Sequence, residues 1–314
     1  MKSIALFACT FWIVAACTVE SGTDDDDDDD DDDVISDVDA GGGGGNADAS
    51  GEDCPTMAMG TAGTHIVADV SWSATTGVIA GEGKLHIWTR STMAFDGNDV
   101  SAMVSPCGSE VPEVERSALL GGGLVKLEVP NTVWDSPDMP KFNASGSISG
   151  FNPGATIMMD PVANVVGATM TDPMGGAWPA SGQELTGVDH DGNGFGGITS
   201  KPKATPPYTL PPVDLIGAII PTGERADQLY IATRSIIELS GTRSSCEAAS
   251  GTADISRFDT HVIGCHLKSG GQCSPAQAGF VDENRMLYQI DGATYTMKRV
   301  DNGASCADVR AALP

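Results

Sequence analysis

The sequence predicts an all-β domain, folded as an antiparallel barrel or sandwich with one or two short helices. Apolar and polar residues alternate with a period of two along several short segments, which is typical of strands that bury one face. Turn-forming residues separate these segments at short intervals, and no long stretch has helical periodicity. The alternating segments cover residues 64–72, 84–89, 124–129, 145–149, 228–239, 252–255 and 294–300.

Short helices are expected near the C-terminus. Ser274 followed by Pro275 is a typical helix start, because the serine side chain can cap the first turn and proline is tolerated there. A second short helix fits the stretch from Ser305 to the end of the chain. Both helices would pack beside the strands of the β domain.

One stretch of the β domain is repeated. Residues 85–97 align without gaps on residues 229–241, with six identical positions that include a Thr-Arg-Ser triplet and the final glycine. The alternation is kept, so we interpret the pair as a duplicated strand, in which Arg90 and Arg234 are equivalent. Outward-facing arginines are the simpler expectation, whereas inward-facing ones would mark a polar binding site. The domain would then consist of two related halves, 54–200 and 205–314.

Residues 1–16 have the features of a bacterial signal peptide. Lys2 supplies a positive charge, and residues 4–16 form an apolar run that is too short to span a membrane. The run ends in Val14-Ala15-Ala16-Cys17, which resembles the bacterial lipobox. The resemblance implies cleavage before Cys17, lipid attachment to its thiol and a mature chain anchored to a membrane by acyl chains. An ordinary secreted protein, cleaved after the same small residues, is the alternative.

Residues 17–53 are predicted to form a disordered, acidic and glycine-rich stalk. Ten consecutive aspartates occupy residues 24–33, five glycines occupy residues 41–45, and no Lys or Arg is present. Such a segment cannot bury apolar surface and its charges repel each other, so it should be extended. We interpret it as a tether; a surface-export signal and a weak calcium-binding segment are alternatives. Residues 54–314 carry 27 acidic and 16 basic residues, so nucleic-acid binding is not expected.

The cysteines of the β domain predict three disulfide bonds. Their even number in an exported chain is typical of a disulfide framework. Cys265 and Cys273 flank a turn and are expected to pair across it, while the other four leave three connectivities open. Metal ligation by Cys265 and His266 with His261 is the alternative. The six cysteines are Cys54, Cys107, Cys246, Cys265, Cys273 and Cys306.

A single motif suggests metal chemistry. Residues 189–194, Asp-His-Asp-Gly-Asn-Gly, resemble the start of a calcium loop, in which Asp189, Asp191 and Asn193 would direct alternate oxygens at one cation. Ser200 stands where an EF-hand has its bidentate Glu, so the motif is closer to the loops of thrombospondin type 3 and integrin-like repeats. An Asp/Asn/Gly turn between strands is the alternative. Calcium is thus the one cofactor that the sequence suggests.

Motifs of the common enzyme classes are missing. The sequence has no GxSxG elbow, HExxH helix, glycine-rich phosphate loop or SxxK pair. The sequence therefore favours a non-catalytic function, and no catalytic residue can be named. A hydrolase whose site is assembled only by the fold is the alternative.

Three features together resemble uncharacterised lipoproteins of gliding and predatory bacteria: the lipobox, the acidic stalk, and a cysteine-bearing β domain with a loop like residues 188–194. The resemblance implies a lipid-anchored protein of the cell envelope. Thr18, where an aspartate would favour the inner membrane in enterobacteria-like sorting, favours the outer membrane. The expected function is binding of a ligand or protein partner, or a structural role in the envelope; a closed barrel with an apolar cavity would favour a carrier.

Overall fold

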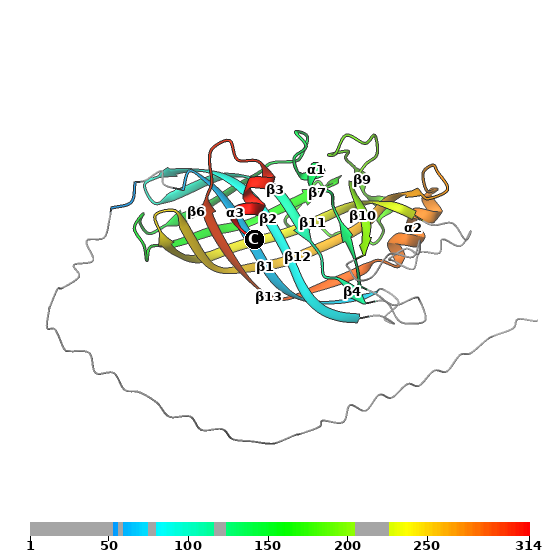
Figure 1. Ribbon diagram of the computed structural model, residues 1–314, viewed down its shortest axis with the longest axis horizontal. Coiled ribbons are helices and arrows are strands. Elements are labelled where there is room, and N and C mark those ends of the chain that lie inside the picture. Colours follow the sequence, from blue (N-terminus) through cyan, green and yellow to red (C-terminus); the bar gives the residue numbers. More distant parts are fainter. Residues whose placement is uncertain (1–52, 56–58, 75–79, 116–123, 205–225) are drawn as a thin grey trace, which may run out of the picture. The chain divides into compact units, whose positions relative to one another are not determined.

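The domain is a closed antiparallel β-barrel (Figure 1). A computed structural model describes residues 53–55, 59–74, 80–115, 124–204 and 226–314. Eight strands follow one another around the ring in chain order, and each pairs antiparallel with the next. The all-β prediction is therefore confirmed. The ring strands are β1 (Thr61–Ala74), β2 (Ala80–Asp96), β3 (Asp99–Glu110), β6 (Phe142–Ile148), β7 (Thr156–Val166), β11 (Ala226–Ser245), β12 (Ala248–Leu267) and β13 (Met286–Arg299).

The ring closes where the last strand returns to the first. β13 pairs with β1 over nearly its whole length, from Ala62 opposite Arg299 to Ala74 opposite Met286. On its other side β13 pairs with β12 over five residues, Ala248–Thr252 opposite Thr294–Lys298. Closure gives each ring strand a paired neighbour on both sides, although the β12–β13 pairing does not extend beyond these five residues.

Different strands complete the wall at the two ends. β6 and β7 are shorter than the strands beside them, and β5 (Leu124–Glu128) and β10 (Ile198–Ala204) continue the wall beyond them. β10 pairs with β11 next to the end of β7, and β5 joins β10 to the end of β3. The chain leaves the wall after β7 at Gly167, whose φ of 80° and close approach to Ile231 leave no room for a side chain. β4 (Val114–Glu115) pairs with β5.

The barrel is packed with apolar side chains at the end that holds the β2–β3, β6–β7 and β11–β12 turns. Inward-facing residues alternate with outward-facing ones along each strand, as Leu85, Ile87 and Met93 do on β2. The same cluster includes Ile237 on β11 and Ile255 on β12, so strands far apart in the sequence meet in one core. In the sequence, this core is indicated by the alternation of apolar and polar residues with a period of two.

The repeated pattern lies on β2 and β11, which are the second and sixth strands of the ring. Arg90 and Arg234 both face outward, and each binds a backbone carbonyl of a segment that covers the barrel: Arg90 that of Ala304, and Arg234 that of Gly176 at 2.6 Å. Neither arginine forms a polar site inside the barrel. The simpler expectation for these residues holds, and the duplication of the two halves stays a prediction.

Helices and short segments cover parts of the outer surface. α2 (Pro275–Glu283) packs against β12, and α3 (Cys306–Ala312) packs against β1, β2 and β3; each begins with a capping box, at Ser274 and Ser305. Among the described residues, none of the helices has the length and apolar character needed to cross a bilayer. The smaller elements are α1 (Asn131–Trp134), β8 (Ala168–Thr169), η2 (Gly182–Glu184) and β9 (Thr186–Gly187).

Three disulfide bonds connect the six cysteines. Cys265 and Cys273 are joined across the turn before α2, which is the pair that the sequence favours. The other two bonds join residues far apart in the chain. Because Cys265 is disulfide-bonded, the alternative metal site with His266 and His261 does not form. The long-range pairs are Cys54–Cys246 and Cys107–Cys306.

The two kinds of disulfide should differ in their contribution to stability. Cys107–Cys306 closes a loop with a sequence separation of 199, whereas Cys265–Cys273 has a separation of 8. Loop-closure entropy then predicts that replacing the first pair by alanines lowers the free energy of unfolding by roughly 2–3 kcal/mol more than replacing the second. Urea unfolding of the two double-alanine variants measures the difference. A larger loss from the short pair would contradict this entropic account.

Candidate functional site

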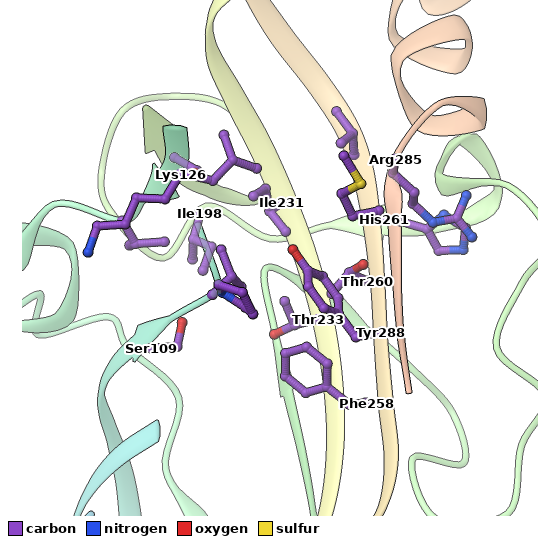
Figure 2. A pocket seen from close by; sticks show the side chains of 17 residues that line it. Ser109, Lys126, Ile198, Ile231, Thr233, Phe258, Thr260, His261, Arg285 and Tyr288 are labelled. Carbon is purple, nitrogen blue, oxygen red and sulfur yellow. The ribbon is translucent and has the colours of Figure 1, made fainter. Parts of the chain in front are cut away.

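A cavity lies at the end of the barrel opposite the β2–β3, β6–β7 and β11–β12 turns (Figure 2). Its volume is about 90 Å³. The ends of β3, β5, β10, β11, β12 and β13 provide its walls, so it lies where β5 and β10 replace β6 and β7. Protein interiors rarely leave voids larger than a water molecule, and this one therefore needs a functional explanation.

Most of the lining is apolar. Ile198 and Ile231 face it from β10 and β11, Phe258 and Val262 from β12, and Met286 from β13. An apolar cavity holds water poorly because the water finds few hydrogen-bond partners there. A small apolar ligand could therefore displace solvent at little cost.

The charged side chains at the cavity have partners outside it. Lys126 Nζ lies 3.0 Å from a carboxylate oxygen of Glu110, and in Figure 2 its ammonium group points away from the other lining side chains. Arg285 Nη1 donates to the backbone oxygen of Asp282 at 2.9 Å and lies 3.5 Å from its carboxylate. The lining thus presents methyl groups, rings and hydroxyls in preference to charges.

Hydroxyl groups provide the neutral polar part of the lining. Thr233 and Thr260 are paired across β11 and β12, and Tyr288 lies on β13. Burial raises the pKa of Tyr288 far above its usual value, so its hydroxyl keeps its proton at neutral pH. The ring of Tyr288 contacts that of Phe258 edge to face, with centroids 5.8 Å apart, which restrains its orientation.

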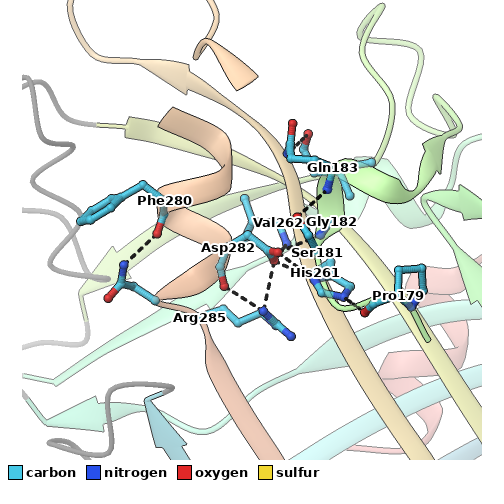
Figure 3. A network of polar contacts seen from close by, with 11 residues as sticks. Pro179, Ser181, Gly182, Gln183, His261, Val262, Phe280, Asp282 and Arg285 are labelled. Atoms are coloured by element: carbon cyan, nitrogen blue, oxygen red, sulfur yellow. Dashed lines mark hydrogen bonds and ion pairs between the residues drawn. The ribbon is translucent and has the colours of Figure 1, made fainter. Parts of the chain in front are cut away.

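A buried ion-pair network stands behind the cavity wall and holds α2 against β12 (Figure 3). His261 Nδ1 lies 2.8 and 2.9 Å from the two carboxylate oxygens of Asp282, and both side chains are almost completely buried. The carboxylate also accepts the amides of Gly182 and Val262, at 2.8 and 2.9 Å. Burial alone would raise the pKa of Asp282, but the hydrogen bonds from His261 and these amides hold it below its usual value.

The pair of His261 and Asp282 has the wrong surroundings for nucleophilic catalysis. A Ser–His–Asp site needs the second imidazole nitrogen to contact the nucleophile. Here His261 Nε2 lies 2.8 Å from the carbonyl oxygen of Pro179, and Trp178 stacks on the ring. With both nitrogens engaged, the imidazole is held between two segments and has no free nitrogen for a nucleophile.

The candidate calcium loop stabilises itself with the oxygens that a cation would need. The Asp189 carboxylate accepts the amides of Gly192, Asn193 and Gly194, at 2.8, 3.2 and 2.8 Å, and these bonds outweigh burial and lower its pKa. Asp191 Oδ2 accepts the amide of Thr199 at 2.8 Å. Asn193 Oδ1 accepts the amide of Phe195 at 2.6 Å. This is the geometry of an Asp/Asn turn, and calcium binding by the loop stays a prediction.

Two histidines lie side by side on the outer face of β1 and β2. His65 Nε2 is 3.0 Å from His86 Nδ1, and both rings stack with Trp88, whose indole N–H donates to the carbonyl of Leu313 at 2.8 Å. Burial is the largest cause that lowers the pKa of both histidines. Within the described ranges, no three His, Cys, Asp or Glu side chains gather as a metal centre. The stacked rings instead hold the C-terminal residues against the barrel, through the hydrogen bond from Trp88 to Leu313.

The residues of the cavity were not recognisable from the sequence. Thr233 belongs to the repeated segment, but its alternation fits a packed strand as well as a cavity wall. Tyr288 precedes the segment 294–300 that the alternation predicts. The predicted lipid-attachment residue, Cys17, lies outside the described residues.

Loss of the Asp282 charge should destabilise the domain. Removing one partner of a buried ion pair costs roughly 3–5 kcal/mol, so Asp282→Asn should lower the free energy of unfolding by that amount at pH 7. Asp69→Asn is the control, because Asp69 and Lys84 form an exposed pair expected to contribute less than about 1 kcal/mol. Chemical denaturation measures both, and equal effects would contradict a stabilising role for the buried pair.

The same carboxylate should make stability depend on pH. A lowered pKa in the folded state means that the stabilisation is complete above about pH 4 and is lost as the pH falls through the folded-state pKa of Asp282. The gap in unfolding free energy between the unchanged chain and Asp282→Asn should therefore narrow as the pH falls from about 4 to about 2. A gap that is constant over this range would count against the assignment.

Known proteins supply no relative from which to transfer a function. A scan against protein-family models, a search of curated proteins and a search of solved structures each find no match to this chain. The candidate site is therefore interpreted from the residues and geometry of this chain.

Proposed function

We propose that the domain binds a small, largely apolar molecule in the cavity of its barrel, and that a lipid anchor at Cys17 holds this site in the cell envelope. The cavity itself is the observation that carries the proposal. The ends of six strands provide its walls, and the lining consists mainly of aliphatic and aromatic side chains.

The size of the cavity limits the ligand. Sites for drug-sized molecules have volumes of roughly 300–1,000 Å³, whereas this cavity has about 90 Å³. A single ring or a short aliphatic chain fits this space better than a polycyclic molecule. The ligand is therefore a small molecule, or the apolar end of a larger one.

The location is supported by the sequence and by the cysteines. Residues 1–17 have the order of a lipoprotein signal peptide, and the anchor would place the chain on a membrane through Cys17. Disulfide bonds persist in exported proteins and are rare in reducing compartments. Three of them in one domain agree with an oxidising site such as the bacterial envelope.

Binding can be tested with toluene, a small apolar ring, titrated calorimetrically into the full chain. We expect saturable binding with one site per chain. Ile231→Phe places a larger side chain at the cavity wall and should weaken binding by about tenfold or more, which corresponds to about 1.4 kcal/mol. Leu287→Phe is the matched control, since Leu287 neighbours Tyr288 on β13 but is 42% exposed. No saturable binding to the unchanged chain would refute the proposed ligand site.

The anchor can be tested independently. Cys17→Ser removes the thiol that would carry lipid, so the protein should move from the membrane fraction to the soluble fraction. Mass spectrometry of the mature N-terminus is the direct measurement. A chain cleaved elsewhere, or one that stays membrane-bound as Cys17→Ser, would contradict the lipoprotein assignment.

A further inference from the structure

We infer that the ligand of the cavity carries an uncharged hydrogen-bonding group, such as a hydroxyl, and that Tyr288 recognises this group together with Thr233 and Thr260. This inference rests on the proposed ligand-binding function and names the chemical class of the ligand. It comes from the distribution of hydroxyls and charges over the cavity lining.

The three side chains that carry these hydroxyls belong to three neighbouring strands and line the same part of the cavity. Thr233 on β11 lies opposite Thr260 on β12, and Figure 2 shows Tyr288 of β13 between them in the lining. Among the described residues, none of these hydroxyls has a hydrogen-bond partner, whereas the hydroxyl of Ser200 in the same lining donates to the carbonyl of Glu128 at 3.4 Å. The three half-buried hydroxyls are therefore available to a polar group of a ligand.

The position of the Tyr288 hydroxyl is fixed before a ligand arrives. The edge-to-face contact with Phe258 restrains the ring, and the β13 backbone is held by its pairing with β1, where Tyr288 lies opposite Trp72. A phenol has only two rotatable side-chain bonds ahead of its ring, so little conformational entropy is lost on binding. Most of the free energy of a hydrogen bond between the ligand and this hydroxyl can therefore appear as binding affinity.

The charge of the lining favours a neutral group over an ionised one. Lys126 is bound to Glu110, Arg285 contacts Asp282, and His261 is held between Asp282 and Pro179. A carboxylate in the cavity would lose its hydration without a cation reserved for it, which is costly in an apolar site. Tyr288 stays protonated because burial raises its pKa, so it meets the ligand as a neutral donor or acceptor.

Three probes of nearly the same shape separate these contributions: toluene, 4-methylphenol and 4-methylbenzoate. The unchanged chain should bind 4-methylphenol about five- to tenfold more tightly than toluene, the gain expected from one buried hydrogen bond. It should bind 4-methylbenzoate more weakly than either. Calorimetric titration of the full chain gives the three dissociation constants.

Two variants locate the recognition. Tyr288→Phe should abolish the preference for 4-methylphenol while leaving the affinity for toluene within about twofold, and Thr260→Val should reduce the same preference. Tyr295→Phe is the matched control, because it makes the same change at a tyrosine whose hydroxyl is buried in the packed core and not in the cavity lining. This control should keep the preference.

The outcomes distinguish the two proposals. If no probe binds the unchanged chain, the ligand-binding function itself fails. If toluene binds as tightly as 4-methylphenol, or if both Tyr288→Phe and Thr260→Val keep the preference, the cavity is a ligand site but its hydroxyls do not select the ligand. Tighter binding of 4-methylbenzoate than of 4-methylphenol would overturn the neutral class.

Discussion

The pairing of β13 with β1 is the constraint on which the rest of the structure depends. Without it the sheet would have two free edges, and the apolar faces of its strands would not enclose a common interior. Because the pairing joins the first and last strands, it forms only between residues more than two hundred positions apart in the sequence. The two long-range disulfides reinforce this arrangement by tying the start of the domain to the β11–β12 turn and the C-terminal helix to β3.

The cavity is a consequence of how the wall is completed. Where β6 and β7 end, β5 and β10 take their places between β3 and β11, and the side chains at this end leave a cavity of about 90 Å³, compared with one of about 50 Å³ in the packed cluster. The network of His261 and Asp282 then holds α2 at the rim beside the cavity. The position of the larger of these two cavities thus follows from the lengths of the strands.

Local signals predicted the class of the fold but not its site. Period-two alternation revealed most ring strands, and Ser274 and Ser305 revealed the helix starts, because these signals involve residues near each other in the chain. β3 and β7 were missed: Pro106 and Pro161 interrupt their patterns, although both strands pair on two sides. The contact of His261 with Asp282 and the meeting of Tyr288 with Thr233 depend on ring closure, which no short stretch of sequence encodes.

The Cys54–Cys246 bond also determines how the domain responds to mechanical load. Tension applied to the chain before Cys54 reaches the disulfide ahead of β1 and passes into the turn between β11 and β12. These two strands pair over almost their full length, so the load is shared by many hydrogen bonds pulled together. Without the bond, the same tension would reach β1 directly at Thr61, on the strand whose pairing closes the barrel.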